Sequence, residues 1–357
     1  MGLIQGYIGY ATSSNCPLPP SAPSCAPPAP PPPPPSPADP PADKQTSVIN
    51  SLFQPFLLPI TAKQFISRSG KKFPLKKKPR ITKPLGKDIL IMDVETRPLD
   101  DAGKVLNRHL PDIEEVPYDT MGRLDHYMYA RIHGYDYKLM QLIEGDLKAQ
   151  WAKVIAMDKA LRDYKVVVFI DADALWSYPH VPVEWLMNHW GMTDETVIAL
   201  PDDVSGGWED VYGNRGMNTG FCITQQAPST RDLFERWITC PDETRYPECS
   251  KYKEDGLKEQ SAFIDFIRHD YNGSEIVTIP CTEAMGYPGQ KEGDGECTGD
   301  FVQHFTTWKD GVGTAVQHSV MQYFMERVHK QFHGEFNDIV VDELHSQPKT
   351  YSETPYS

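Results

Sequence analysis

The chain has 357 residues and a formal net charge of −14, from 35 basic and 49 acidic residues. Residues 63–87 hold ten Lys or Arg and no acid, so residues 88–357 hold 24 basic against 47 acidic residues. A folded part this acidic argues against a nucleic-acid partner, and it would need a cation to hold a phosphate.

The first 87 residues do not resemble a globular domain. Fifteen of the 25 residues from 17 to 41 are proline, which predicts a stiff, solvated polyproline II-like segment. We therefore expect residues 1–47 to be disordered and residues 48–87 to form a basic linker that could touch anionic lipid. The start of the chain lacks the pattern of a signal peptide. Prolines and polar residues interrupt the apolar residues of 48–66, so we predict no transmembrane helix.

From residue 88 onward, short apolar runs alternate with segments of helical spacing. The short runs predict strands at 89–94, 135–139, 166–170, 197–200, 217–224, 276–279 and 301–304. The helical spacing predicts helices at 123–133, 147–161, 183–190, 228–239, 259–269 and 314–332, followed by a polar tail from 333 to 357. This alternation predicts an α/β fold: a single domain over 88–332 with a mostly parallel central sheet flanked by helices.

The run at 166–170, Val-Val-Val-Phe-Ile, predicts a central strand buried on both faces. Asp171 and Asp173 follow at its C-terminal end, which is where ligands bind in open α/β sheets. Two carboxylates at a dry strand end repel each other unless a cation lies between them. Our hypothesis is a divalent metal that holds a phosphorylated ligand. The alternative is a pair of acids in an ordinary solvated loop.

The seven cysteines include no Cys-x-x-Cys pair, so a zinc ribbon or a thioredoxin motif is not expected. Cys240 with Cys249, and Cys281 with Cys297, could each close a short loop in an oxidising compartment. Reduced thiols are the alternative. A glycosylation sequon at 272–274, Asn-Gly-Ser, agrees with a secretory location. The chain contains no Gly-x-Ser-x-Gly elbow, no P-loop and no His-Glu-x-x-His motif.

Five motifs between about 89 and 310 together resemble glycosyltransferase family 34, and they follow the order of that family. They are Tyr-x-x-x-His-Gly at 129–134, Trp-Ala-Lys at 151–153 with Phe-Ile-Asp-Ala-Asp-Ala at 169–174, Asn-Thr-Gly at 218–220, Glu-Gln-Ser-Ala at 259–262, and His304 with Lys309. The family contains fungal Golgi α-galactosyl- and α-mannosyltransferases and plant xyloglucan xylosyltransferases. This chain departs from its pattern at Glu259, where the family has Asp, at 307–310, where Thr-Trp-Lys-Asp replaces Gly-Cys-Lys-Pro, and in the missing N-terminal anchor.

The resemblance implies a GT-A-like (Rossmann-like) fold and a metal-dependent glycosyltransferase of the Golgi or secretory lumen. The enzyme would move a hexose, galactose or mannose, from a nucleotide-diphosphate sugar to a glycan hydroxyl with retention of configuration. Its cofactor would be Mn²⁺ or Mg²⁺, since both accept oxygen ligands and Mn²⁺ tolerates imidazole. The alternative function is a non-catalytic subunit with the same fold in a Golgi transferase complex.

The candidate residues fall into a metal group and a substrate group. Asp173 is expected to bind the metal, and Asp171 to be a second ligand or a contact to the ribose. The resemblance implies that His304 completes the coordination and that Lys309 meets the diphosphate. The remaining candidates are Asn218 and Gln260 for sugar hydroxyls, Glu259 near the anomeric carbon, Lys153 for phosphate and Trp208 for stacking on a sugar. Their structural alternatives are a tight turn at 218–220, an ordinary buried histidine and solvated helix surfaces.

Overall fold

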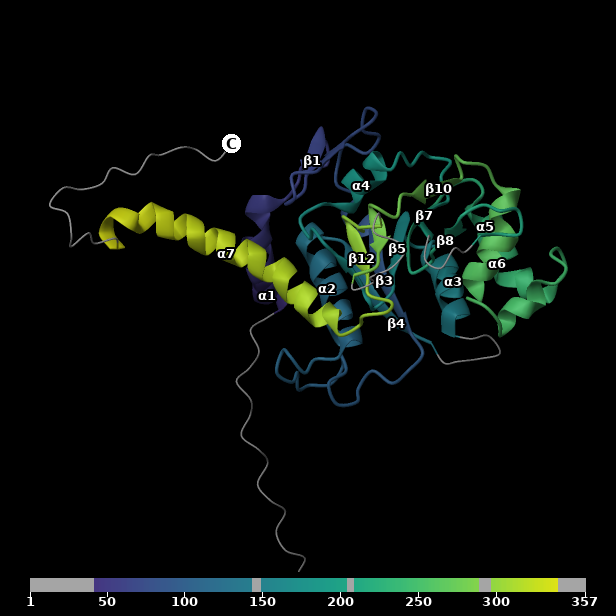
Figure 1. Cartoon of the computed structure of the whole chain (residues 1–357), viewed down its shortest axis with the longest axis horizontal. Helices are drawn as coiled ribbons and strands as arrows, with labels where there is room; N and C mark the ends of the chain where they lie inside the picture. Colours follow the sequence, from purple (N-terminus) through teal and green to yellow (C-terminus); the bar gives the residue numbers. More distant parts are fainter. Residues whose placement is uncertain (1–41, 143–148, 204–208, 289–296, 340–357) are drawn as a thin grey trace, which may run out of the picture. The chain divides into compact units, whose positions relative to one another are not determined.

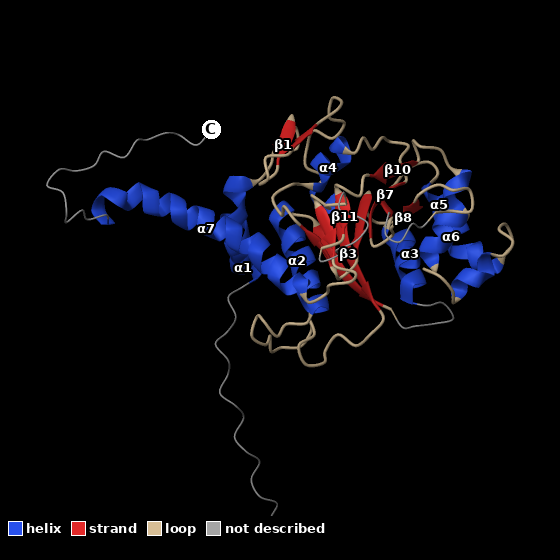
Figure 2. Ribbon diagram, viewed as in Figure 1, coloured by secondary structure: helices blue, strands red, loops and turns tan. Residues whose placement is uncertain are grey.

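The computed structural model describes residues 42–142, 149–203, 209–288 and 297–339. A seven-stranded sheet lies at the centre, with helices on both faces (Figures 1 and 2). Its strands run in the order β10-β7-β9-β5-β3-β4, and the short β8 pairs with β7. Their bounds are β3 Ile89–Glu95, β4 Asp136–Gln141, β5 Val166–Ile170, β7 Ile198–Asp203, β8 Gly216–Met217, β9 Phe221–Gln225 and β10 Ile276–Ile279.

Five of the seven strands in this sheet, namely β3, β4, β5, β7 and β10, point in the same direction. Strand β3 pairs in parallel with β4 and β5, and β7 pairs in parallel with β10. Strand β9 runs antiparallel between β5 and β7, and β8 is antiparallel to β7. The predicted α/β class, with a mostly parallel central sheet flanked by helices, is confirmed. The carboxyl ends of β3, β5 and β7 consequently meet at one edge of the sheet.

Seven helices lie in the described ranges: α1 Ala42–Phe53, α2 Tyr118–His133, α3 Ala149–Ala160, α4 Val183–His189, α5 Thr230–Thr239, α6 Glu259–Asp265 and α7 Gly311–Ile339. Short 3₁₀ turns lie at Gln54–Phe56, Gly86–Asp88, Cys240–Asp242, Cys249–Lys253 and Ile267–Asp270. Helix α2 ends at Gly134, which has the left-handed conformation (φ 73°) that favours glycine. Side chains of α2 and α4 join one core cluster, and those of α3, α5 and α6 join the other.

Strand β5 is buried on both faces, as its apolar sequence predicts. All five of its residues are buried. Val166, Val168 and Ile170 belong to the core cluster under α2 and α4, whereas Val167 and Phe169 belong to the cluster under α3, α5 and α6. Alternation along one strand therefore joins the two halves of the core.

A second, three-stranded sheet that the sequence did not predict lies beside the first. It consists of β11 (Ala284–Gly286), β12 (Val302–His304) and β6 (Ala174–Trp176), in that order. Strand β12 runs antiparallel to β6 in a register that sets His304 opposite Ala174. Since β6 starts directly after Asp173, this register brings the C-terminal part of the chain to the end of β5.

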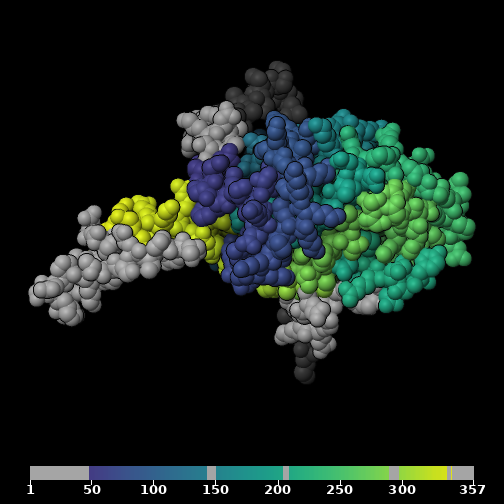
Figure 3. Space-filling model, turned by 90° about the horizontal axis from the view of Figure 1, so that it is seen from above, coloured from purple at the N-terminus to yellow at the C-terminus, as the bar shows by residue number. Residues whose placement is uncertain are grey.

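Residues 48–87 are part of the folded unit, contrary to the predicted basic linker. Helix α1 is followed by a hairpin of β1 (Gln64–Ile66) and β2 (Lys72–Pro74). Phe65, Phe73 and Ile81 are buried in the core cluster that includes side chains of α2 and α4, while the lysines and arginines between them are exposed. The space-filling view shows this N-terminal part packed directly on the later elements (Figure 3). Residues 1–41, the bulk of the predicted disordered segment, lie outside the described residues.

Helix α7 differs from its prediction in length and in its surroundings. It runs to Ile339, so the polar tail expected from 333 begins as helix. Val312, Val316 and Tyr323 are buried, whereas Phe324 and Val328 are 50% and 41% exposed. None of the helices in the described ranges has the length and apolar run that a bilayer crossing requires.

Both predicted cysteine pairs form disulfides. Cys240 is bonded to Cys249, and Cys281 is bonded to Cys297. Cys222 is a buried free thiol. Cys16 and Cys25 lie outside the described residues. The two bonds suggest a secreted or lumenal protein.

The hairpin supplies a stability test of the corrected boundary. Phe73 is 2% exposed, and its ring lies 4.8 Å from that of Phe301. We expect Phe73→Ala to lower the free energy of unfolding by about 3–5 kcal/mol, because it opens a cavity in the main core. The neighbouring Lys72→Ala, at an exposed position, should change it by less than about 0.5 kcal/mol. Chemical denaturation measures both, and equal small effects would restore the linker interpretation.

Candidate active site

The turn after β5 carries two carboxylates toward the same space. Asp171 donates its backbone N–H to the carbonyl of Gly220 at 2.7 Å, and its own carbonyl accepts from Ala174 N at 2.8 Å. The second bond closes the turn between β5 and β6, and the first ties this turn to the residue before β9. Asp173 is buried, and Asp171 is partly buried. The two acids are therefore not part of an ordinary solvated loop.

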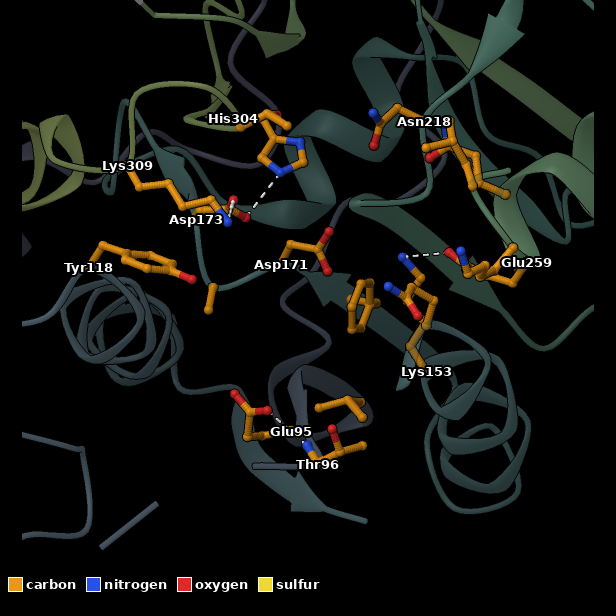
Figure 4. Close-up of a pocket in the computed structure, with 18 of the residues that line it drawn as sticks. Glu95, Thr96, Tyr118, Lys153, Asp171, Asp173, Asn218, Glu259, His304 and Lys309 are labelled. Carbon is orange, nitrogen blue, oxygen red and sulfur yellow. Dashed lines mark hydrogen bonds and ion pairs between the residues drawn. The ribbon is translucent and has the colours of Figure 1, made fainter. Parts of the chain in front are cut away.

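His304 reaches this turn from strand β12. Its Nε2 lies 3.0 Å from Asp173 Oδ1. One ligand atom each from Asp171, Asp173 and His304 can be chosen so that all lie within 4.8 Å of one another. Figure 4 shows the imidazole and the two carboxylates facing one another. The structure thus brings together the three residues predicted to bind metal.

The pKa values of the two carboxylates in the cluster shift in opposite directions. Burial raises the pKa of Asp171, against the opposing charges of Lys153 and His304. Burial also acts to raise the pKa of Asp173, but the hydrogen bond and charge of His304, together with Lys309, lower it overall. Asp173 is consequently the carboxylate that these cations hold ionised.

A divalent cation fits this donor set. Two carboxylates and one imidazole are ligands that Mn²⁺ accepts, and the carboxylates also suit Mg²⁺. His304 Nδ1 is buried without a hydrogen-bond partner among the described residues, so the pair with Asp173 leaves the imidazole incompletely satisfied. The residues present therefore fit a divalent cation, and one nitrogen of the imidazole is left without a partner in the described ranges.

Gly220 provides the space in which the cluster lies. A Cβ added at this position would lie 2.7 Å from His304 Cε1, 2.8 Å from Asp171 Oδ2 and 2.9 Å from Asn218 Oδ1. Carbon atoms do not approach that closely without displacement of their neighbours. The glycine of the Asn218-Thr219-Gly220 motif is thus required by close approach; its backbone φ is not positive.

Two lysines border the cluster from opposite sides (Figure 4). Lys309 Nζ lies 3.3 Å from Asp173 Oδ2 and 4.9 Å from the centre of the Tyr118 ring, and its side chain is 43% exposed. Lys153, on α3, is buried and lies 2.8 Å from Glu259 Oε1. Lys309 can therefore reach a ligand in the pocket, whereas Lys153 is fixed by an ion pair.

The predicted substrate residues line the opposite wall of the same pocket. Asn218, Glu259 and Gln260 are all buried. Glu259 Oε1 and Gln260 Oε1 both accept hydrogen bonds from Thr219, at 2.8 Å from Oγ1 and 3.0 Å from the backbone N. The helix start at 259 and the 218–220 turn are thus held as one unit. Trp208 lies outside the described residues.

Two residues of this wall were not predicted. Asp203 Oδ2 accepts from Asn218 Nδ2 at 3.0 Å and from Gln260 Nε2 at 3.4 Å, and Asp203 Oδ1 accepts from Tyr287 OH at 2.7 Å. The predicted strand stopped at 200, although β7 runs to Asp203. The rule that identified Asp171, a carboxylate at the C-terminal end of a buried strand, would have identified Asp203 as well.

The pocket is completed by the end of β3. Its volume is about 920 Å³, and its lining includes Glu95, Arg97, Tyr118 and Arg123 in addition to the metal cluster. Glu95 Oε1 accepts from Arg97 Nε at 2.9 Å, and Glu95 also pairs with Arg123. Despite burial, the bonds from Arg97 and the charge of Arg123 lower the pKa of Glu95 to about 2. Glu95 is therefore ionised, paired with two arginines and separate from the two acids of the cluster.

The close contacts of Gly220 give a test of the cluster. We expect Gly220→Ala to weaken binding of Mn²⁺ at least tenfold, because the added methyl group displaces His304 or Asp171 from its position. Isothermal titration calorimetry with Mn²⁺ measures this, with circular dichroism as the check on folding. The matched control is Gly273→Ala, whose Cβ meets nothing within 4 Å. Unchanged affinity in folded Gly220→Ala would contradict the assignment.

No protein-family model and no curated protein matches the chain. Among solved structures it is similar to a glycosyltransferase involved in glycosylation of the major capsid of PBCV-1 (11% identity, TM-score 0.45, 64% of this chain and 98% of that one). It is also similar to the galactosyltransferase LgtC in complex with donor and acceptor sugar analogs (12% identity, TM-score 0.38, 65% of this chain and 95% of that one). A third similar structure is mouse xyloside xylosyltransferase 1 (10% identity, TM-score 0.35, 61% of this chain and 97% of that one). At these identities and scores, the geometry of the site alone carries the functional argument.

Proposed function

We propose that this protein is a metal-dependent glycosyltransferase that uses a nucleotide-diphosphate sugar. The observation that carries this proposal is the Asp171–Asp173–His304 cluster in a polar pocket of about 920 Å³, with the Lys309 ammonium beside it. A strongly acidic protein can hold a diphosphate only where cations offset its own charge. Lys309 and a divalent cation held by the cluster would provide that charge at the carboxyl ends of the strands, where such ligands bind.

The metal would be held by Asp171, Asp173 and His304. When bound, a divalent ion offsets the negative charge that develops on a departing diphosphate. Imidazole in the ligand set favours Mn²⁺ over Mg²⁺. Lys309 is free to turn from Asp173 toward the diphosphate, since almost half of its side chain is exposed.

The buried wall opposite the cluster would bind the sugar. Asn218, Gln260 and Asp203 present amide and carboxylate groups that match the hydroxyls of a hexose. Galactose from UDP-galactose and mannose from GDP-mannose are the donors we favour, with a glycan hydroxyl as acceptor. Glu259 is fixed by Lys153 and Thr219 at the floor of this wall.

We further propose transfer with retention of configuration. The acceptor oxygen would bond to the anomeric carbon on the face from which the diphosphate departs. Its proton would pass to a phosphate oxygen of the leaving group. This route requires no dedicated base on the protein. It agrees with a site in which each of Glu95, Asp173 and Glu259 lies within 4.0 Å of a cation.

Loss of single ligands tests the function. We expect Asp173→Asn and His304→Ala to lower Mn²⁺-dependent release of nucleoside diphosphate by about 100-fold or more, because each removes a ligand from the site. A coupled assay over several UDP- and GDP-sugars measures this release. The control is Asp88→Asn, which removes an acid at the opposite edge of the sheet. The opposite outcome is a wild-type protein that releases no nucleoside diphosphate from any donor and gains no thermal stability from UDP and Mn²⁺. That result would contradict the enzyme and favour the alternative function, a non-catalytic subunit.

We propose the secretory or Golgi lumen as the compartment, in agreement with the two disulfides. The sequon gives an independent test, since its asparagine is glycosylated only in the secretory pathway. Asn272 is exposed just before β10, so it is accessible to the modification, and it lies away from the carboxyl edge of the sheet that holds the pocket. In eukaryotic secretory expression, we expect peptide N-glycosidase to increase the gel mobility of the wild-type protein. Asn272→Gln should abolish this shift, and Gly273→Ala, which keeps the sequon, should preserve it. A wild-type protein insensitive to the glycosidase would argue against entry into this pathway.

A further inference from the structure

Helix α2 lies directly against the turn that carries the two carboxylates. A Cβ added to Gly122 would lie 1.9 Å from the carbonyl oxygen of Ala172, the residue between Asp171 and Asp173. The atom in the way is backbone, so no side-chain movement can relieve the clash. Any residue larger than glycine at position 122 must therefore displace either the helix or the turn.

One helical turn later, His126 holds the same segment by a hydrogen bond. Its Nε2 lies 2.8 Å from the carbonyl oxygen of Ala174. A carbonyl can only accept, so Nε2 carries the proton and donates it. The other nitrogen, Nδ1, lies 3.0 Å from Asp93 Oδ1, and Asp93 also accepts from Tyr137 OH at 2.8 Å. His126 and Asp93 are fully enclosed, with 0% and 1% exposure, so solvent does not compete for these bonds.

A third contact joins helix α2 to the same segment, two residues further along the chain. Asp125 Oδ2 accepts from the backbone N–H of Trp176 at 3.2 Å. Gly122, His126 and Asp125 thus contact the backbone of residues 172, 174 and 176. The proposed metal ligands alternate with these positions, at 171 and 173. The helix holds every second residue by its backbone and leaves the carboxylates free to face the pocket.

Helix α2 is itself tied to the pocket wall at the end of β3. Arg123 pairs with Glu95 of β3, and it donates from Nη1 to Asp119 Oδ2 at 3.0 Å. The pairs are buried and charge-assisted, which favours a single geometry. One segment, residues 119–126, consequently connects the end of β3 to the turn after β5.

We infer that Gly122 and His126 are positioning residues that set the affinity of the metal site. They act through the turn: the contacts fix Ala172 and Ala174, and these fix Asp173 relative to His304, which pairs with Ala174 in the strand register. Side chains that orient metal ligands without touching the metal commonly change affinity 10- to 100-fold when altered. This inference rests on the proposed function in one respect, namely that the cluster binds a divalent cation.

The test measures Mn²⁺ binding without turnover. The free Mn²⁺ signal in electron paramagnetic resonance gives the dissociation constant of the full-length protein, and circular dichroism and thermal unfolding report the fold. We expect His126→Phe, which removes the donor to Ala174, to weaken binding at least about tenfold. His126→Gln places an amide N–H near the position of Nε2 and should recover most of the affinity. A merely structural role predicts no such difference between two folded variants.

Gly122→Ala has a matched control within another helix. Gly313 of α7 meets nothing within 4 Å of an added Cβ. Gly313→Ala should therefore leave Mn²⁺ affinity unchanged, whereas Gly122→Ala should reduce it at least about tenfold. If Gly122→Ala does not fold, the His126 pair decides the question alone.

The outcomes separate the inference from the proposed function. Folded His126→Phe that binds Mn²⁺ as tightly as the wild-type protein overturns the positioning role and leaves the metal site intact. A wild-type protein that does not bind Mn²⁺, alone or with UDP, overturns the metal-dependent function and the positioning role with it. Weakened binding in His126→Phe with recovery in His126→Gln supports the inference.

Discussion

The structure depends on the placement of two carboxylates at the end of a strand that is buried on both faces. An ionised acid in such surroundings is costly unless opposite charge and hydrogen bonds offset its desolvation. His304 and Lys309 supply that charge to Asp173, and the charge of Lys153 acts on Asp171, so that three other elements contribute. The elements that deliver these cations, namely β12, the loop before α7 and α3, therefore have to converge on one edge of the sheet.

This convergence requires the backbone to come unusually close in two places. Gly220 lies against His304 and Asp171 on one side of the turn, and Gly122 lies against Ala172 on the other. The turn is thus enclosed between β9 and α2 with no room for an additional carbon atom. Close packing of this kind makes the geometry of the carboxylates a property of the whole fold, because neither side can move alone.

Local signals explain what the sequence alone could predict. The apolar run before Asp171 has the length of a strand and no polar alternation, so both the strand and its terminal acids could be predicted from neighbouring residues. His304 and Lys309 lie in a three-residue strand and its loop, and only the family resemblance singled them out. The hairpin with Phe65 and Phe73 was mistaken for a linker because each short strand buries one aromatic residue among exposed lysines. The role of Gly122 could not be predicted, since its neighbour Ala172 is 50 residues away.

The placement of β12 also determines when the site can exist. All seven strands of the main sheet precede residue 280, whereas His304 and Lys309 follow residue 300. During synthesis, the strands of the central sheet are therefore all made while Asp171 and Asp173 still lack the imidazole of His304 and the ammonium group of Lys309. The proposed cation site is complete only when β12 has paired with β6. The last strand of the described residues therefore supplies the imidazole of the proposed site, whereas the strands of the central sheet are all made before it.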